Sequence, residues 1–337
     1  MIYDTLLKRC FPPHSIHNHR DRYIDMTKAI AILLMVIGHS EFIYWYGFTK
    51  SLIFSFHMPL FFIVSGYMHK QKSIREIFNK SVESLLYTYI TFGAVAYLFL
   101  FFFRDAPISS LWKVLINANT SSARSFWFTG GYTIGPIWFL IALFWGRLFF
   151  TAVLHYFSRW HLPICLLLSI LAVQCALRIN VPLGILYGIS SLVFLSIGYQ
   201  IKQSGVTVAF LLLCVIIWPF SMNYPLDMAG FLYDNYFLNV IGAIGGTACC
   251  FFLSTIAANI KIINKFEFFG RYSLHVLCWH YLIMNVFPVA TGKLYSSIFV
   301  ISPFVVTFFA VKYRLFTFMF KPVWKSKKVL SYLNKLP

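Results

Sequence analysis

The sequence predicts an all-α integral membrane protein, a polytopic bundle of about ten transmembrane helices. Of its 337 residues, 59% are hydrophobic and only 11% are charged, and the mean hydropathy is +0.74. Apolar segments of about 20 residues, the length that crosses a bilayer core, recur along nearly the whole chain. The ten-residue alternation of an outer-membrane barrel is not seen. This composition excludes a soluble globular domain.

Ten apolar segments qualify as spans, and the basic residues between them indicate their orientation. The expected spans are 29–48, 51–68, 82–103, 135–155, 162–178, 183–201, 206–221, 235–257, 268–290 and 295–314. With the N-terminus in the cytoplasm, 22 of the 28 Lys and Arg residues fall on the cytoplasmic side, as the positive-inside rule requires. We therefore expect both termini in the cytoplasm. The net charge of +18 mainly reflects this topology, and nucleic-acid binding is not expected without a soluble basic domain.

The chain is expected to divide into three parts. A basic cytoplasmic segment at 1–28 precedes the transmembrane domain at 29–314, and a basic cytoplasmic tail follows at 315–337. The first segment has neither the apolar core nor the cleavage site of a signal peptide. The tail is expected to lie on the anionic inner leaflet.

Two polar stretches are expected on the outer side of the membrane. Residues 104–134 are rich in Ser, Thr, Asn and Gly, and residues 222–234 include Asp227 and Asp234. A long polar loop of the first kind is typical of a lid or of a segment that faces a substrate.

The seven cysteines are scattered without CxxC or metal-ligand spacing, so they are interpreted as small packing residues.

The first expected span carries Lys28 and His39, the most informative polar pair in the chain. Ten residues separate them in KAIAILLMVIGHS, and eleven helical steps make about three turns, so both side chains share a face roughly 16 Å apart along the axis. Titratable groups are costly in a bilayer, which makes each one a candidate for function. The pair predicts a cationic entrance at the cytoplasmic edge with a proton-transfer group near mid-membrane. Asp25, one turn before Lys28, either orients it or forms an ordinary surface ion pair.

The second expected span, SFHMPLFFIVSGYMHK (55–70), places a second histidine close to the first. His57 and Pro59 lie in its outer half, at the depth of His39 if the first two spans form an antiparallel hairpin. Pro59 removes a backbone hydrogen bond and can kink the helix. Ser65 and Gly66 allow a helix or a slim ligand to approach closely. A structural hydrogen bond for the histidine and simple packing for the Ser-Gly pair remain the alternatives.

The stretch IDMTKAIAILLMVIGHS (24–40), followed by FHMPLFFIVSGY (56–67), a basic loop and a third span, resembles the acyltransferase-3 family of integral-membrane acyltransferases. Within that family the chain is most similar to the fucose O-acetylase-like branch, whose members modify surface glycans. Supporting matches are GPIWFL (135–140), SIGYQIK (196–202) and FGRYSLHVLCWH (269–280). The resemblance covers essentially the whole chain, and its specific part is the Lys-x10-His spacing with the HMPLFF run.

The resemblance implies an enzyme of the bacterial inner membrane that transfers an acyl group, usually acetyl, from cytoplasmic acetyl-CoA to a glycan hydroxyl. It maps the essential histidine of the family's first motif onto His39 and the basic partner onto Lys28. Many members carry an Arg-x-x-Arg pair just before the third span, and the aligned positions here are Ser81 and Ser84. The charge that binds the donor phosphates is therefore expected from other residues.

The chemistry of acyl transfer requires a base for the hydroxyl proton and cations for the anionic donor. Histidine titrates near neutrality, so His39 is the predicted general base, with a transient acyl carrier as the alternative, and His57 is the second catalytic candidate. The predicted ligands of the donor phosphates are basic residues near the cytoplasmic mouth: Arg22, Lys28, Lys70, Lys72, Arg75 and Lys80. No permanently bound cofactor is expected, because acetyl-CoA acts as a co-substrate.

Four residues are candidates for binding the acceptor: Glu41, Ser65, Trp138 and His280. Glu41 points about 200° away from His39 on a helix, which also favours packing or the outer interface. Trp138 lies where an aromatic belt is expected, and it is placed to stack on a sugar ring. His280 matches a family position, with a structural hydrogen bond as the alternative. No metal site is expected, because the histidines lack an evident carboxylate second shell.

Two further interpretations stay open. Buried basic and histidine residues also mark transport pathways, so a transporter or flippase of a lipid-linked glycan is the alternative outside the enzyme class, although no inverted repeat is evident. Within the enzyme class, the donor could carry succinyl or another acyl group. The expected partners are acetyl-CoA, a glycan or lipid-linked glycan, and the bilayer. The sequence leaves open the identity of the glycan, the side on which it is modified and whether the protein forms a homo-oligomer.

Overall fold

The computed structural model describes residues 22–40, 47–118, 134–179, 181–205, 207–286 and 293–322. The longer helices are α2 (Arg22–Gly38), α4 (Gly47–Phe54), α5 (His57–Tyr67), α6 (Ile74–Ser81), α7 (Tyr87–Arg104), α9 (Trp138–Phe157), α10 (His161–Ala176), α12 (Leu192–Ser204), α13 (Val208–Ser221), α14 (Tyr236–Asn259), α16 (Ser273–Val286) and α17 (Lys293–Lys312). The shorter ones are α8 (Leu111–Asn117), α11 (Ile185–Ser190) and α15 (Glu267–Arg271), and the π-helical turn η1 (Val82–Leu86) joins α6 to α7. Short 3-10 turns lie at Ile108–Ser110, Gly135–Ile137, Ser158–Trp160, Ile263–Phe266 and Thr317–Met319.

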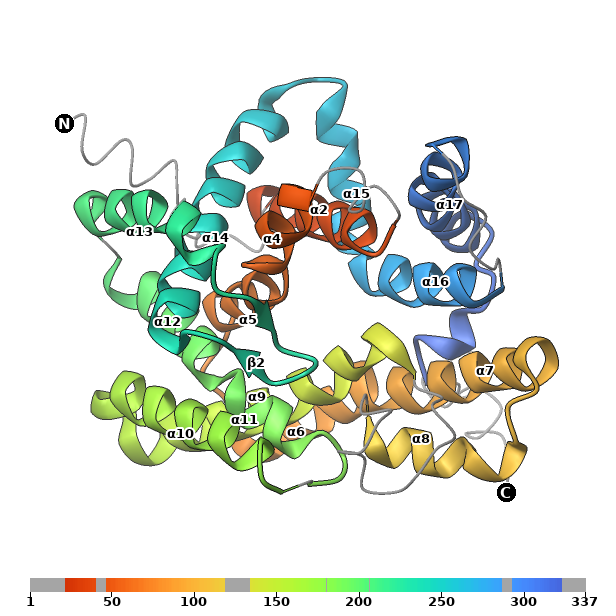
Figure 1. Ribbon diagram of the computed structural model, residues 1–337, viewed down its shortest axis with the longest axis horizontal. Coiled ribbons are helices and arrows are strands. Elements are labelled where there is room, and N and C mark those ends of the chain that lie inside the picture. The colour runs from red at the N-terminus through yellow and green to blue at the C-terminus, as the bar shows by residue number, and fades with distance from the viewer. Residues whose placement is uncertain are drawn as a thin grey trace, which may run out of the picture.

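The helices surround a central pair, α2 and α5. Figure 1 shows these two in the middle of the molecule, with α12 and α13 on one side and α16 and α17 on the other. Helix α2 contacts α5, α14, α15 and α16. Helix α5 contacts α2, α12 and α14. The helix that precedes His39 and the helix that begins at His57 therefore occupy the core of the bundle.

Six helical segments of the described chain are long and apolar enough to cross a membrane: Gly47–Tyr67, Ile74–Phe103, Gly135–Ala176, Ile185–Ser204, Tyr236–Asn259 and Tyr295–Lys312. The apolar helices Val208–Ser221 and Ser273–Met284 are shorter. These segments confirm an all-α, multi-pass membrane protein, whereas the expected ten spans and the side of the termini are not confirmed. The 42 residues of Gly135–Ala176 would extend for about 63 Å, roughly twice a bilayer core. The chain bends instead between α9 and α10, where Phe157 has the non-helical angles φ −136° and ψ 40°.

The first helix differs from the expected span 29–48. It begins at Arg22 and ends at Gly38, and the next described helix begins at Gly47. Glycine and serine favour a helix less than alanine or leucine do, and here they flank His39 at the point where the helix ends. The backbone N–H of His39 still donates to the carbonyls of Met35 and Val36, both at 3.2 Å. His39 therefore follows directly on the helix that carries Lys28 instead of lying inside it.

The second span is broken next to His57, as Pro59 predicts. Because proline has no backbone N–H, the carbonyl of Ser55 loses its helical donor. Helix α4 ends at Phe54 and α5 begins at His57, so that Pro59 lies in the first turn of α5, where a missing N–H is tolerated. The break places His57 at the start of a new helix, directly beside the end of α4.

Glycines set how closely the central helices pack. Gly66 of α5 lies against the backbone of Leu195 in α12, and Gly198 of α12 lies against the backbone of Ile63. A side chain at either position would overlap the neighbouring backbone, which confirms the close approach predicted for the Ser65–Gly66 pair. In the same way, Gly270 of α15 lies against the backbone of Asp25. That contact brings the charged ends of α15 onto the start of α2.

A two-stranded hairpin forms in the polar segment 222–234. Strands β1 (Leu226–Asp227) and β2 (Leu232–Tyr233) pair in antiparallel fashion. The turn between them is attached to α11, because the hydroxyl of Tyr187 donates to the carbonyl of Ala229 at 2.9 Å. The Tyr187 ring also stacks on Phe231, with centroids 4.3 Å apart. The hairpin therefore lies over the bundle and contributes Asp227 to one of its cavities.

Candidate active site

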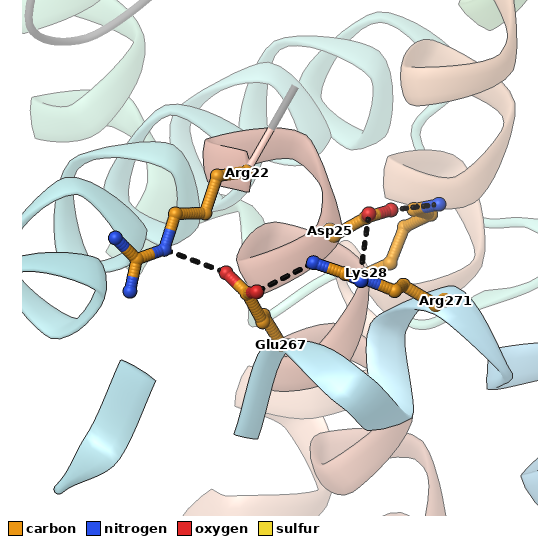
Figure 2. Close-up of polar contacts among 5 residues, drawn as sticks. All are labelled: Arg22, Asp25, Lys28, Glu267 and Arg271. Atoms are coloured by element: carbon orange, nitrogen blue, oxygen red, sulfur yellow. Dashed lines mark hydrogen bonds and ion pairs between the residues drawn. The ribbon is translucent and has the colours of Figure 1, made fainter. Parts of the chain in front are cut away.

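Lys28 belongs to a network of five charged side chains at the start of α2, drawn in Figure 2. Its ammonium lies 2.7 Å from a carboxylate oxygen of Asp25, whose side chain is only 2% exposed. Arg271 approaches the other oxygen of Asp25 at 3.5 Å and pairs with Glu267 at 2.6 Å. Glu267 also pairs with Arg22 at 2.7 Å. Asp25 therefore holds Lys28 in place, as one of the two sequence interpretations predicted.

A cavity of about 550 Å³ opens beside Lys28. Five of the residues that line it are cations: Lys28, Lys70, Lys72, Lys80 and Arg147. No Asp or Glu is found among the described residues of its wall. Apart from two serines, the rest of that wall is apolar and includes Met35, Met58 and Leu140. A cavity whose wall combines several cations with many apolar side chains suits a ligand with an anionic head and a slim, less polar arm.

A second cavity of about 220 Å³ lies on the other side of two methionines. Met35 and Met58 line both cavities, so their side chains form the partition between them. The second cavity holds both predicted catalytic histidines, His39 and His57. Its other described lining residues are Phe54, Gly135, Pro136, Trp138, Leu226, Asp227, Met228, Ala229 and Met284. Lys28, near the start of α2, and His39, just after its end, thus line two different, adjoining cavities.

A third histidine, His280 of α16, lies against His39. Their ring centroids are 5.5 Å apart with the planes inclined by 24°, and the His39 ring also meets the edge of Phe54 at 5.9 Å. The Nδ1 of His280 lies 2.6 Å from the carbonyl of Leu277, and the Nδ1 of His57 lies 2.9 Å from the carbonyl of Ile53. A carbonyl oxygen only accepts, so in both rings Nδ1 carries the proton and Nε2 is an acceptor when the ring is neutral.

The Nε2 atom of His280 is buried without a hydrogen-bond partner among the described residues. A buried polar atom in that condition is unusual and is typical of sites that take a ligand or a proton. Because its ring lies beside His39, the two histidines form a stacked pair at the end of α2. His57 completes the group from the start of α5.

The structure brings most of the predicted site residues together. Lys28, Lys70, Lys72, Lys80 and Ser65 line the larger cavity, and His39, His57 and Trp138 line the smaller one. Ser65 therefore lies with the expected donor ligands and not with the acceptor candidates. Arg22 is held by Glu267, and neither Arg22 nor Arg75 belongs to the described wall of the larger cavity. Glu41 lies outside the described residues.

Two charged residues that line the cavities were not among the predicted site residues. Arg147 lies inside the apolar helix α9, where a charged side chain is itself a signal of function, but the sequence did not show which way it faces. Asp227 stood out only as an acid of an outer segment, and the hairpin brings it to the smaller cavity. Its carboxylate accepts from the N–H of Ala229 at 2.9 Å, which fixes the turn.

The two serines in the positions of the Arg-x-x-Arg pair contribute no charge, and their hydroxyls do not line the cavity. The Ser81 hydroxyl is buried without a hydrogen-bond partner in the described part of the chain. The Ser84 hydroxyl donates to the carbonyl of Lys80 at 2.7 Å. Ser84 lies within the π-helical turn η1, and Ser81 directly precedes it.

Comparison with known proteins gives a family and two relatives. The family model described as an acyltransferase domain, acyltransferase-3, matches residues 21–316. A nodulation protein NolL from Mesorhizobium japonicum is 28% identical over 123 residues, which cover 33% of each chain. A nodulation protein NolL from Sinorhizobium fredii is 36% identical over 73 residues, or 19% of this chain and 20% of that protein. The aligned regions thus span a third or less of these curated relatives. No solved structure of another protein matches the chain significantly.

Proposed function

The chain belongs to the acyltransferase-3 family, and we propose that it transfers an acetyl group from cytoplasmic acetyl-CoA to a hydroxyl of a cell-surface glycan. The observation that carries this proposal is the pair of adjoining cavities along α2. One has five cations in its described wall and suits a CoA donor, the other is lined by His39 and His57, and Met35 and Met58 line both. Two reactants that enter from opposite sides would meet at His39.

The proposed orientation follows from the same cavities. The larger one, with its lysines from the α5–α6 connection, faces the cytoplasm, where acetyl-CoA is available. The smaller one, covered by the hairpin, faces the outer side of a bacterial inner membrane. This orientation has both termini in the cytoplasm and ten spans, in agreement with the distribution of basic residues. The ten are obtained by counting α9 and α10 separately and by including α2, α13 and α16.

In the proposed reaction His39 acts as the general base. Its imidazole takes the proton of the acceptor hydroxyl while that oxygen attacks the thioester carbonyl. The tetrahedral intermediate then collapses, the C–S bond breaks, and the imidazolium returns the proton to the CoA thiolate. The products are an O-acetyl ester and free CoA. His280 stacks on His39 in this proposal and fixes the orientation of its ring.

The acceptor is proposed to bind in the smaller cavity through its sugar ring. Trp138 lines this cavity and is the proposed stacking partner of the sugar, and the Asp227 carboxylate is the proposed acceptor for its hydroxyls. At about 220 Å³ the cavity is below the usual range of drug-sized sites. It suits roughly one ring of a glycan, with the remainder outside.

The test uses purified protein in nanodiscs with acetyl-labelled acetyl-CoA and glycan extracted from the producing cells. We expect labelled ester on the glycan with the unmodified protein and at least 100-fold less with His39→Ala, the usual size of a general-base contribution. His155→Ala is the matched control, since His155 is an exposed histidine at the far end of α9. Full activity of His39→Ala would refute the assignment.

The same assay separates the alternatives. A flippase would move glycan between leaflets without labelling it. An enzyme for another acyl group would leave acetyl-CoA unused while consuming succinyl-CoA or a longer donor. Either result would replace the acetyl-transfer proposal.

A further inference from the structure

Arg147 belongs to the apolar helix α9 and lines the larger cavity, which is called the donor cavity below because it is the proposed site of acetyl-CoA. Ion pairs in the described part of the chain involve Asp25, Glu76 and Glu267, and none includes Arg147. An unpaired cation in a membrane helix is costly, and such residues are kept where they serve a ligand or a pathway. Arg147 thus lies in the wall of the larger cavity with no described carboxylate to compensate its charge.

The other cations of this cavity are in a different situation. Lys28 is paired with Asp25 at 2.7 Å, and Lys72 is paired with Glu76 at 3.5 Å. Lys70 and Lys80 are exposed, so water compensates their charge at little cost. Arg147 alone among the five combines partial burial with the absence of a described carboxylate partner.

A second observation at the same place concerns His69, which is 4% exposed. Its carbonyl accepts from the ammonium of Lys202 at 3.2 Å, while its Nε2 is buried without a hydrogen-bond partner among the described residues. Burial, and then the nearby charges of Arg147 and Lys202, lower the pKa of His69 to about 4. The ammonium of Lys202 thus lies on the backbone of His69, directly before Lys70 in the wall of the larger cavity, and the buried ring nitrogen of His69 has no described partner.

We propose that Arg147, together with Lys70 and Lys202 beside His69, forms a phosphate-binding site that holds the CoA portion of the donor. The proposal rests on the donor assignment made above and adds to it the residue that anchors the phosphates. It also explains how this chain dispenses with a basic pair at Ser81 and Ser84, since the charge comes from α9 and α12 instead of the third span.

The chemistry of the side chain suits this role. A guanidinium is planar, stays charged in a protein and binds phosphate oxygens in bidentate fashion, which a lysine does not do. The exposed Lys70 and Lys80 sit on the rim where the remaining phosphate charge of a CoA molecule would lie. From there the apolar wall formed by Phe61, Leu140 and Met58 leads to the partition beside His39.

The experiment compares two ligands, CoA and a phosphate-free acetyl-pantetheine thioester, on the full-length protein in nanodiscs. Arg147→Gln should weaken CoA binding, measured by calorimetry, about 10- to 100-fold, the loss expected for a charge-assisted hydrogen bond. It should leave the KM for acetyl-pantetheine unchanged, because that donor has no phosphate to lose. Arg159→Gln, at an exposed arginine of the Ser158–Trp160 turn, is the matched control and should change neither value.

Arg147→Lys keeps the charge but not the planar fork, so it should show a smaller loss of CoA affinity. If Arg147→Gln does not fold, the CoA affinity of Arg147→Lys is the test. An affinity equal to that of the unmodified protein would overturn the proposal. Equal losses for CoA and acetyl-pantetheine also overturn it, because they indicate a structural role for Arg147.

The same phosphate chemistry could come from a lipid headgroup, so the binding is measured in neutral nanodiscs and in nanodiscs with anionic lipid. Retention of anionic lipid that depends on Arg147, with unchanged CoA affinity, would assign the site to lipid and refute the proposal.

CoA binding does not require turnover. If CoA binds through Arg147 but no acetyl group is transferred, the proposed function fails while this site stands.

Discussion

Replacing Asp25 by Asn tests whether the charged network of Figure 2 holds the entrance of the donor cavity together. The substitution keeps the size of the side chain and removes its charge. Lys28, whose side chain is only 16% exposed, then loses the carboxylate 2.7 Å away. Arg271 loses a weaker contact at 3.5 Å, and because it is 43% exposed it can turn to water.

The expected cost comes almost entirely from Lys28. Removing one partner of a buried ion pair costs about 3–5 kcal/mol, and the lower end applies here because water in the adjoining cavity can reach the ammonium. The Arg271 contact adds at most about 1 kcal/mol, as for an exposed pair. We therefore expect a loss of about 3 kcal/mol and a melting temperature lowered by roughly 5 °C for a chain of this size.

Thermal unfolding in detergent micelles measures the effect, with Glu76→Gln as the matched control. Glu76 forms an exposed ion pair with Lys72 at 3.5 Å, and glutamine preserves the capping box with Ser73, so its loss should stay below about 1 kcal/mol. Asp25→Asn combined with Lys28→Met should recover part of the stability, since no buried charge is then left alone. The reasoning would be refuted if Asp25→Asn and Glu76→Gln lowered the stability equally. It would also be refuted if the double variant were no more stable than Asp25→Asn alone.

Three further predictions concern the cavities and the packing of the helices. Met58→Ala should open the partition and raise the rate with longer acyl donors relative to acetyl-CoA, measured as a ratio of kcat/KM values; an unchanged ratio would show that Met58 does not limit the acyl group. Trp138→Ala should raise the KM for glycan about tenfold, as expected for loss of a stacking contact of about 1–2 kcal/mol, without changing the KM for acetyl-CoA. Gly66→Ala should destabilise the protein by about 1–3 kcal/mol, because the new methyl group overlaps the backbone of Leu195; a melting temperature equal to that of the unmodified protein would contradict this packing.

Much of the fold could be predicted because a bilayer limits the choice of structure. Apolar segments of sufficient length have to be helices there, since every backbone polar group needs a partner. The kink at Pro59 and the close approach at Gly66 were also predictable, because a missing N–H and a missing side chain act locally. The end of α2 at Gly38 was not, because helix boundaries depend on neighbouring elements as well as on propensity.

The candidate site was predictable to the extent that it lies on one stretch of chain. Lys28 and His39 lie eleven residues apart, so their spacing alone predicted an entrance at one and a proton-transfer group about three turns further along, although α2 ends one residue before His39. The positions of His280, Arg147 and Asp227 are different, because each comes from an element distant in sequence. The place of His280 beside His39, and of Arg147 and Asp227 in the cavity walls, depends on how α16, α9 and the hairpin pack, which a periodic pattern does not contain.

The sequence by itself therefore determined a helical membrane protein, a Lys–His pair eleven residues apart near its start and the absence of an arginine pair before the third span. Only the tertiary structure decided that the pair opens into two cavities divided by Met35 and Met58. It also decided that Lys28 is already neutralised by Asp25, whereas Arg147 has no carboxylate partner in the described chain. The physical reason is that helix formation depends on neighbours within a few residues, while cavities and charge compensation depend on side chains that only packing brings together.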